Sequence, residues 1–238
     1  MLDIFLDYIY PRNIKCIVCK CPIDKGNSYS LCKDCFREIK FITNSCYRCG
    51  KVLTDFYKED LCPVCSDKEY NFDRGFCCTV YDDNIHKIIY SFKYGGNTFL
   101  SYPIAQIMKD KIHYEGIYFD YIVPVPLHKN RKNKRGFNQA FLISKNLGKF
   151  MDKEVLDIVI RNKDTRFLSK LSKFEREIEL KDSFTISKEK YKIVSKDILL
   201  IDDIFTTGTT SSEIAKILKN NGANKVYALS FASGRNIY

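Results

Sequence analysis

The fold of this 238-residue chain is decided by one stretch, residues 198–210, which reads Ile-Leu-Leu-Ile-Asp-Asp-Ile-Phe-Thr-Thr-Gly-Thr-Thr. Its apolar first half is typical of a parallel strand covered on both faces, because such a strand need not alternate polar and apolar residues. Residues 211–220 then predict a helix. A buried strand, a small hydroxyl-rich turn and a helix in this order indicate an open α/β sheet.

The polar residues of this stretch predict two kinds of contact with a ligand. Ligands bind at the carboxyl ends of strands in open α/β sheets, and a turn that opens a helix offers N–H groups and hydroxyls to a phosphate. Asp202 and Asp203 would repel a phosphate, so we expect them to accept hydrogen bonds from sugar hydroxyls or to bind a hard cation. Together they predict a phosphorylated sugar. An ordinary buried strand with a capped turn is the structural alternative.

The stretch resembles the loop of type I phosphoribosyltransferases that binds phosphoribosyl pyrophosphate (PRPP). The resemblance implies that Asp202 and Asp203 bind the ribose 2- and 3-hydroxyls, with Mg2+ on the ribose hydroxyls and pyrophosphate. It also implies that the 5-phosphate is bound by the five loop residues Thr206, Thr207, Gly208, Thr209 and Thr210. The hypoxanthine-guanine enzymes carry an acid at the position of Thr206, so purine salvage of that kind is disfavoured.

Eleven cysteines in a chain without a predicted signal peptide point to metal rather than to disulfides. Eight of them form four C-x-x-C pairs, and each pair in the second half of the set lies thirty positions after its counterpart. This internal repeat predicts two structural four-cysteine zinc sites, one per repeat, although an interleaved pairing of the four pairs is the alternative. The predicted ligands are Cys16, Cys19, Cys32, Cys35, Cys46, Cys49, Cys62 and Cys65. Cys77 and Cys78 are expected to be small core residues.

Charge divides the chain into two unequal halves. The formal net charge is +10, yet residues 1–72 hold 11 basic and 10 acidic residues, so 28 of the 39 basic and 19 of the 29 acidic residues remain for the rest. The positive field therefore belongs to the second half, which suggests an anionic partner there. We expect an N-terminal helix and double zinc ribbon over residues 1–72 and an α/β domain over residues 73–238. Acidic residues near the N-terminus argue against a signal peptide, and no apolar run is long enough to insert in a membrane, so a cytoplasmic protein is expected.

The remaining segments alternate between strand and helix patterns, which predicts a doubly wound, mostly parallel sheet of the type I phosphoribosyltransferase kind. The strands are expected at residues 75–81, 121–126, 155–160, 197–202 and 225–232. The helices are expected at residues 3–10, 84–94, 98–113, 136–151, 170–180 and 211–220.

A basic segment follows the second of these strands. Residues 129–135 hold five cations in seven positions, in a loop that we expect at the same sheet edge as the acidic pair, Asp202 and Asp203. A solvated loop is the plain interpretation of such a run. Its place at the carboxyl end of a strand favours binding of a pyrophosphate or another anion, for which arginine offers a fork of donors.

Four motifs together resemble the ComF family of competence proteins, which joins an N-terminal zinc ribbon to a phosphoribosyltransferase-like domain. They are Phe-Lys-Tyr-Gly-Gly at residues 92–96, Pro-Val-Pro-Leu at 124–127, Arg-Gly-Phe-Asn-Gln at 135–139 and the acidic-pair loop. The predicted pyrophosphate or anion ligands are Lys93, Arg131, Arg135, Asn138 and Gln139. Two positions depart from the family, with Leu168 in place of a glutamine and Glu179 in place of an asparagine.

The resemblance implies a role in handling incoming single-stranded DNA during natural transformation, with PRPP as a ligand and other competence proteins as partners. Five phosphate contacts on a single strand would weaken binding roughly a hundredfold between 50 and 200 mM salt. Two alternatives stand beside this one. The protein could be an active phosphoribosyltransferase of nucleotide or amide metabolism, although no residue is seen that selects an acceptor and no catalytic residue is assigned. It could also be a zinc-ribbon interaction module whose second domain has lost its function.

Overall fold

The computed structural model describes residues 13–164, 175, 179–180 and 182–234 of the chain. The helix expected over residues 3–10 and most of the helix expected over residues 170–180 lie outside the described residues. So does Leu168, one of the two departures from the family pattern.

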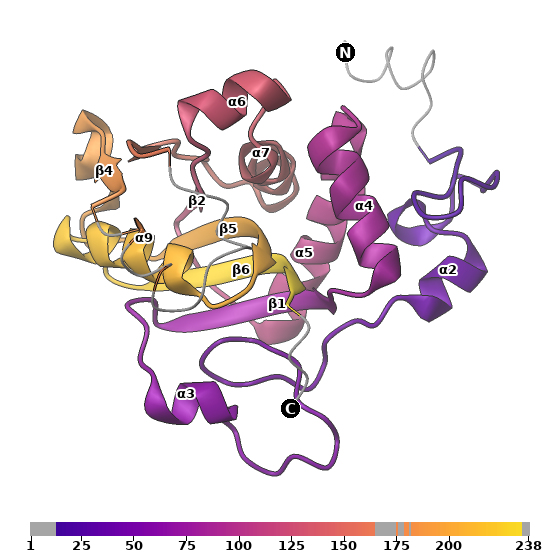
Figure 1. Cartoon of the computed structure of the whole chain (residues 1–238), viewed down its shortest axis with the longest axis horizontal. Coiled ribbons are helices and arrows are strands. Elements are labelled where there is room, and N and C mark those ends of the chain that lie inside the picture. The colour runs from indigo at the N-terminus through magenta and orange to yellow at the C-terminus, as the bar shows by residue number, and fades with distance from the viewer. Residues whose placement is uncertain (1–12, 165–174, 176–178, 181, 235–238) are drawn as a thin grey trace.

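The centre of the molecule is a four-stranded parallel sheet with the strand order β1-β6-β5-β2 (Figure 1). The apolar stretch that ends in the acidic pair forms β5, with Leu200 paired to Val123 on one side and to Ala228 on the other. The predicted parallel α/β sheet is therefore confirmed. The strands are β1 (Arg74–Val80), β2 (Tyr121–Pro124), β5 (Ile198–Phe205) and β6 (Val226–Ser233).

The strand expected over residues 155–160 is only partly right. Val155 touches the sheet through a single parallel bridge to Ile122. The regular strand begins later, as β3 (Val159–Arg161), and pairs antiparallel with β4 (Phe184–Ile186) in a separate two-stranded ribbon. Both pieces bury apolar side chains, and burial alone does not say which strand a segment will pair with.

Helices cover both faces of the sheet, which explains why residues 198–201 are apolar without alternation. Leu199 and Ile201 belong to a core cluster with α4, α5 and α7, whereas Ile198 and Leu200 belong to a second cluster with α9. The helices of the α/β domain are α4 (Asp83–Tyr94), η2 (Thr98–Leu100), α5 (Ser101–Glu115), α6 (Lys129–Arg135), α7 (Gln139–Met151), η4 (Lys188–Ile193) and α9 (Thr209–Asn220).

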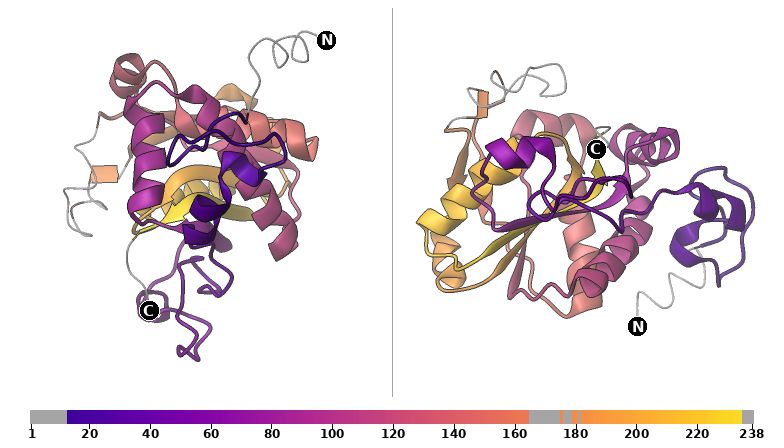
Figure 2. Two further views of the ribbon diagram at one scale, coloured as in Figure 1. Left: turned by 90° about the vertical axis from the view of Figure 1, so that its right-hand side faces the viewer. Right: turned by 90° about the horizontal axis from the view of Figure 1, so that it is seen from below.

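The internal repeat of the sequence is visible in the backbone. Lys15 bridges Pro22 in the first ribbon (residues 15–35), and Ser45 bridges Val52 in the second ribbon (residues 45–65), thirty positions later. Figure 2 shows the first ribbon at one end of the molecule and the second under the sheet. Their helical elements are η1 (Ser28–Ser30) and α2 (Lys33–Glu38) in or beside the first, and α3 (Pro63–Asp67) at the end of the second.

The second ribbon is joined closely to the sheet through β1. The N–H of Gly75 donates to the carbonyl of Arg48, and a Cβ added at Gly50 would lie 2.5 Å from the Cα of Phe76. Only glycine permits two backbones to approach so closely. The second ribbon is therefore part of the packing around the sheet, although the predicted boundary after residue 72 does fall just before β1.

Candidate phosphoribosyl site at the end of strand β5

The acidic pair lies at the carboxyl end of β5, where the sequence predicted it. The N–H of Asp203 donates to Oδ1 of Asp202 over 2.8 Å, and Nζ of Lys93 lies 2.8 Å from the Asp203 carboxylate. Burial, together with the neighbouring charge of Asp203, raises the pKa of Asp202 to about 7. One lysine from α4 thus balances one of the two carboxylates, and the other binds a proton near neutral pH.

The phosphate loop (residues 206–210) follows directly and runs into α9. Gly208 has a φ of +74°, and a Cβ there would lie 2.6 Å from the ring of Phe205 and 2.7 Å from that of Tyr70. The hydroxyl of Tyr70 donates to the carbonyl of Thr207 over 3.1 Å. The residue that precedes α9 is Gly208, which has no side chain to cap the first N–H groups of this helix. Such a helix start favours an anion.

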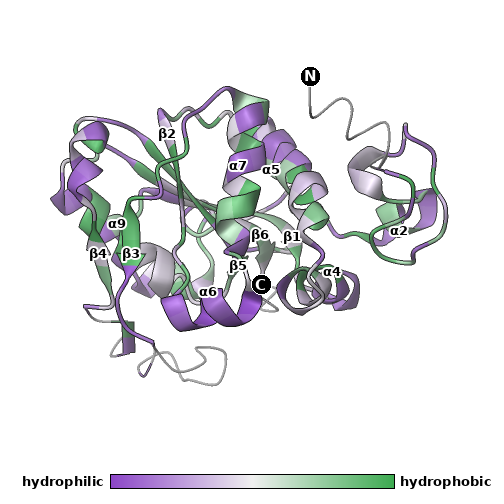
Figure 3. Cartoon of the chain, turned by 90° about the horizontal axis from the view of Figure 1, so that it is seen from above, coloured by the Kyte–Doolittle hydropathy of each residue, from purple (hydrophilic) through white to green (hydrophobic). Residues whose placement is uncertain are grey.

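The basic run is a helix and not the loop that we expected. His128 caps the start of α6 by accepting from the N–H of Asn130, and Gly136 ends it with a φ of +85°. The four-residue spacing puts Arg131 and Arg135 on one half-buried side, while Lys129, Lys132 and Lys134 are exposed. Figure 3 shows α6 as a hydrophilic helix beside α4.

The predicted anion ligands around α6 differ in what they already contact. Nη1 of Arg135 donates to Oε1 of Gln139 over 2.6 Å, and its guanidinium lies over the ring of Tyr94 at 5.2 Å. Nδ2 of Asn138 donates to the carbonyl of Val125, and Oδ1 accepts from the N–H of Ala140 at the start of α7. Asn138 and the buried Gln139 therefore hold the local structure, whereas Arg135 is held at the surface of the site.

Arg161 is a site residue that the sequence analysis missed. Its side chain is buried, and burial, with the nearby charge of Arg131, lowers its pKa to about 10, while Asp202 acts in the opposite direction. β3 thus brings a third arginine toward the acidic pair. The signal in the sequence is a single cation that ends an apolar run, which is weaker than an acidic pair or a cluster of cations at a strand end.

Asp164 lies at the edge of the same group. It accepts a 2.6 Å hydrogen bond from Nδ2 of Asn130, which holds the pKa of Asp164 below its usual range, and Nε of Arg131 lies 3.8 Å away. This carboxylate therefore offsets part of the positive charge at the start of α6.

The eight predicted zinc ligands come together as two groups of four, one per repeat. Within each group all sulfur atoms lie within 4.8 Å of one another, and the sequential pairing is the one found. Tetrahedral zinc with Zn–S bonds of about 2.3 Å requires S···S edges of about 3.8 Å. The Cys19–Cys32 and Cys49–Cys62 sulfur distances are 3.7 and 3.8 Å, so the donor sets fit zinc. Cys77 and Cys78 are buried in β1, as expected.

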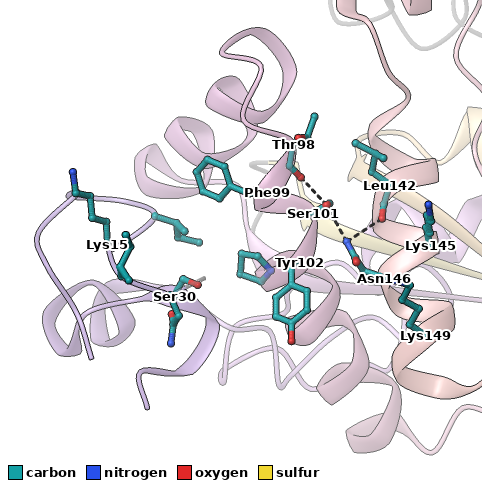
Figure 4. A pocket seen from close by; sticks show the side chains of 14 residues that line it. Lys15, Ser30, Thr98, Phe99, Ser101, Tyr102, Leu142, Lys145, Asn146 and Lys149 are labelled. Carbon is teal, nitrogen blue, oxygen red and sulfur yellow. Dashed lines mark hydrogen bonds between the residues drawn. The ribbon is translucent and has the colours of Figure 1, made fainter. Parts of the chain in front are cut away.

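A cavity of 610 Å3 lies elsewhere, between the first ribbon and the helices α5 and α7 (Figure 4). Phe99 and Tyr102 line it together with Lys15, Lys145 and Lys149. Asn146 donates to the hydroxyl of Ser101 at its back, as Figure 4 shows. It contains neither carboxylates nor a phosphate-binding turn, so its size does not make it the phosphoribosyl site. Among the described residues every helix is too short or too polar to span a bilayer.

Comparison with known proteins gives a consistent picture for both halves of the chain. The double zinc ribbon domain model matches residues 5–66. Competence protein F of Haemophilus influenzae is 29% identical over 220 residues, which cover 90% of this chain and 94% of that protein. The DNA utilization protein YhgH of Escherichia coli is 26% identical, covering 89% and 93%. Competence protein ComFC of Streptococcus pneumoniae is 27% identical, covering 87% and 89%.

The similarity to solved structures is weak, as two of them show. Adenine phosphoribosyltransferase from Thermoanaerobacter pseudethanolicus has a TM-score of 0.37 at 13% identity, covering 58% of this chain and 82% of that chain. Glutamine PRPP amidotransferase from Bacillus subtilis has a TM-score of 0.39 at 16% identity, covering 55% and 26%.

Proposed function

We propose that this chain, a double-zinc-ribbon homologue of competence protein F, ComFC and YhgH, binds a phosphoribosyl compound of the PRPP type at the end of β5 and handles single-stranded DNA at the adjoining basic surface. The observation that carries the proposal is the arrangement at one sheet edge. Strands β5 and β2 are parallel neighbours in the sheet. The acidic pair lies on β5 and the phosphate loop follows it, whereas the two half-buried arginines of α6 follow β2.

Each part of the ligand has a matching group. The carboxylates of Asp202 and Asp203 accept hydrogen bonds from the ribose hydroxyls, and the N–H groups at the start of α9 bind the 5-phosphate. Arg131, Arg135 and Arg161 supply cations for the pyrophosphate. Both acids are hard oxygen ligands of the kind that bind Mg2+, which would neutralise charge on the pyrophosphate.

Lys93 links the acid side of the site to the pyrophosphate side. In the structure Lys93 forms an ion pair with Asp203. Asp202, whose pKa is raised by burial, has no comparable ion pair among the residues described. When Mg2+ and PRPP enter, Lys93 has a second set of acceptors in the pyrophosphate oxygens. We therefore infer that Lys93 keeps the acidic pair in place before the ligand binds and contacts the ligand afterwards.

The DNA part of the proposal is supported by the surface next to this site. Tyr90 and Tyr94 of α4 are 58% and 61% exposed, and their rings lie 5.1 Å apart. Arg135 of α6 lies over Tyr94, and the exposed lysines of α6 continue the surface. Exposed aromatic rings beside cations are what single-stranded DNA requires for base stacking and phosphate contacts.

The decisive experiment compares PRPP binding by the wild type and by D202N/D203N, using calorimetry with Mg2+ present. We expect the double variant to lose measurable binding, while the matched control D55N/D60N, which removes two exposed acids from the second ribbon, keeps wild-type affinity. Equal affinity in all three proteins would refute the site. The same proteins tested for transformation then show whether the site matters for DNA uptake, and release of pyrophosphate from PRPP with a base or amine would establish a transferase instead of a binding protein.

A further inference from the structure

The exposed face of α4 carries a row of aromatic rings. His86, Tyr90 and Tyr94 follow one another at four-residue spacing, which places them on one face of the helix. The ring centroids of the first pair lie 5.9 Å apart and those of the second pair 5.1 Å apart. All three residues are exposed, and the buried face of α4 is filled by three isoleucines and Phe92. This aromatic row therefore contributes little to the core, and a row of exposed rings marks a surface that binds something.

The aromatic row runs between α2 and the phosphoribosyl site. At the start of α4, Nδ2 of Asn84 donates to the carboxylate of Glu38 in α2. At the other end of the row, the guanidinium of Arg135 from α6 lies over the ring of Tyr94, and the neighbouring Lys93 reaches the acidic pair. Figure 3 likewise shows α4 between α2 and α6. A molecule bound along the row thus reaches the edge of the sheet where the ligand is proposed to bind.

The spacing of the rings fits unpaired bases and does not fit a duplex. Four residues of an α-helix rise about 6 Å, whereas the bases of one strand in a duplex advance about 3.4 Å. A stacked strand therefore cannot place one base on each ring, but a strand whose bases are drawn apart can. Two stacking distances exceed the separation of neighbouring rings, so each base lies on the outer face of a ring and not between two rings. Stacking of this kind tolerates any sequence, because every base has a π-face.

The charges around the aromatic row limit the length of strand that it binds. Arg135 and the exposed lysines of α6 adjoin one end of the row. At the other end Asp82 caps the start of α4, and Asp83 lies in its first turn. Carboxylates repel a phosphate backbone, whereas the cations attract it. A strand is therefore favoured only between His86 and the α6 end, which offers one ring to each of about three bases.

We propose that the aromatic row of α4 is a base-stacking track, which binds the unpaired bases of a single strand, one base per ring, and leads that strand to the phosphoribosyl site. The inference rests on the proposed function and names the chemical group that α4 recognises. The strand is then held in two ways, because α6 contacts its phosphates and α4 contacts its bases. DNA and RNA offer the same kind of base face, so probes of both kinds are needed to identify the sugar.

The test uses the full chain and the variant H86A/Y90A, which removes two rings and leaves Tyr94. The conservative variant H86F/Y90F keeps both rings and removes the imidazole and the hydroxyl. The control Y114A/Y118A removes two rings that are 64% and 85% exposed, at the end of α5 and just beyond it. Zinc content and thermal unfolding are compared first. Fluorescence anisotropy between 50 and 400 mM NaCl then measures binding of oligothymidylate, oligouridylate and an abasic deoxyribose-phosphate chain of the same length.

We expect H86A/Y90A to bind oligothymidylate roughly thirtyfold or more weakly than the wild type, because each stacked base contributes to affinity. H86F/Y90F and Y114A/Y118A should remain within about twofold of the wild type. The slope of log K against log salt should be the same in all four proteins at pH 8, since the phosphate contacts on α6 remain. The abasic chain should bind equally to the wild type and to H86A/Y90A. Unchanged binding of oligothymidylate by H86A/Y90A, or an equal loss with the abasic chain, would overturn the track.

Two comparisons separate the track from the proposed function. If D202N/D203N binds PRPP as the wild type does while H86A/Y90A loses oligothymidylate, the phosphoribosyl site fails and the track stands. If D202N/D203N loses PRPP while H86A/Y90A binds every oligomer as the wild type does, the site stands and the track fails. Tighter binding of oligothymidylate than of oligouridylate by the wild type assigns the track to DNA, and the reverse order supports a track for RNA and contradicts the DNA part of the proposed function.

Discussion

The exposed side of α6 allows a quantitative prediction about salt. Of the five cations in the helix, Arg131 and Arg135 are half-buried and the three lysines are exposed. If each exposed lysine makes one phosphate contact on a single strand, the slope of log K against log salt is about −2.1, at about −0.7 per contact. Raising salt fourfold, from 50 to 200 mM, then weakens binding about twentyfold. The expected loss of affinity for single-stranded DNA is therefore smaller than the hundredfold loss calculated for five phosphate contacts.

The perturbation is the variant K129Q/K132Q/K134Q, which removes all three exposed charges. We expect its affinity for a 20-nucleotide oligothymidylate to become nearly independent of salt, while PRPP affinity changes less than twofold. The matched control is K188Q/K190Q on η4, which precedes β5 and so lies near the opposite edge of the sheet from α6. Fluorescence anisotropy between 50 and 400 mM NaCl measures the slopes. The same slope in wild type and triple variant would refute the assignment of α6 to the strand.

Three further predictions concern the site and the ribbons. G208A should unfold about 2–4 kcal/mol more easily in urea and bind PRPP weakly, because a Cβ meets the ring of Phe205 at a φ of +74°, and an unchanged midpoint would contradict this. Burial raises the pKa of Asp202 to about 7, so binding of Mg2+ with PRPP should strengthen from pH 5.5 to 8 as this carboxyl loses its proton. Calorimetry in two buffers should detect extra proton release on binding near pH 6, and the variant D202N should lack it. C62S should lose one zinc ion and also PRPP affinity, whereas C32S should lose only the zinc, as measured by metal analysis and calorimetry.

The parts of the fold that the sequence predicted are those with strong local signals. Residues 198–201 are apolar without alternation, which favoured a covered strand. The thirty-residue repeat of cysteines favoured one metal cluster per repeat over an interleaved pairing, and the structure has the sequential groups. Residues 129–135 carried no apolar periodicity, so a helix was not expected there. That helix depends on its ends, His128 and Gly136, and on the sheet edge that holds its arginines, none of which a count of cations reveals.

The acidic and hydroxyl residues of the candidate site were predicted from the sequence, and the buried Arg161 was missed. Asp202 and the phosphate loop are contiguous in sequence, so their chemistry is readable before their positions are known. Arg161 reaches the same region from β3, about 40 residues away in sequence. The only local signal is that Arg161 ends an apolar run, and that does not predict burial of its side chain, which depends on tertiary packing.

The arrangement of Tyr70 and Gly208 suggests why a zinc ribbon and a phosphate loop occur in one chain. Zinc fixes the second ribbon, since units of this size depend on metal for folding. The close backbone contacts at Gly75 and Gly50 then hold that ribbon against β1. Tyr70 connects it to the phosphate loop, because its hydroxyl donates to the Thr207 carbonyl and its ring packs against Gly208. The shape of the phosphate loop thus depends on a metal centre that never touches the ligand. Loss of zinc from the second ribbon should consequently weaken phosphate binding before the sheet unfolds, whereas the first ribbon, on the other side of the molecule, should have no such effect.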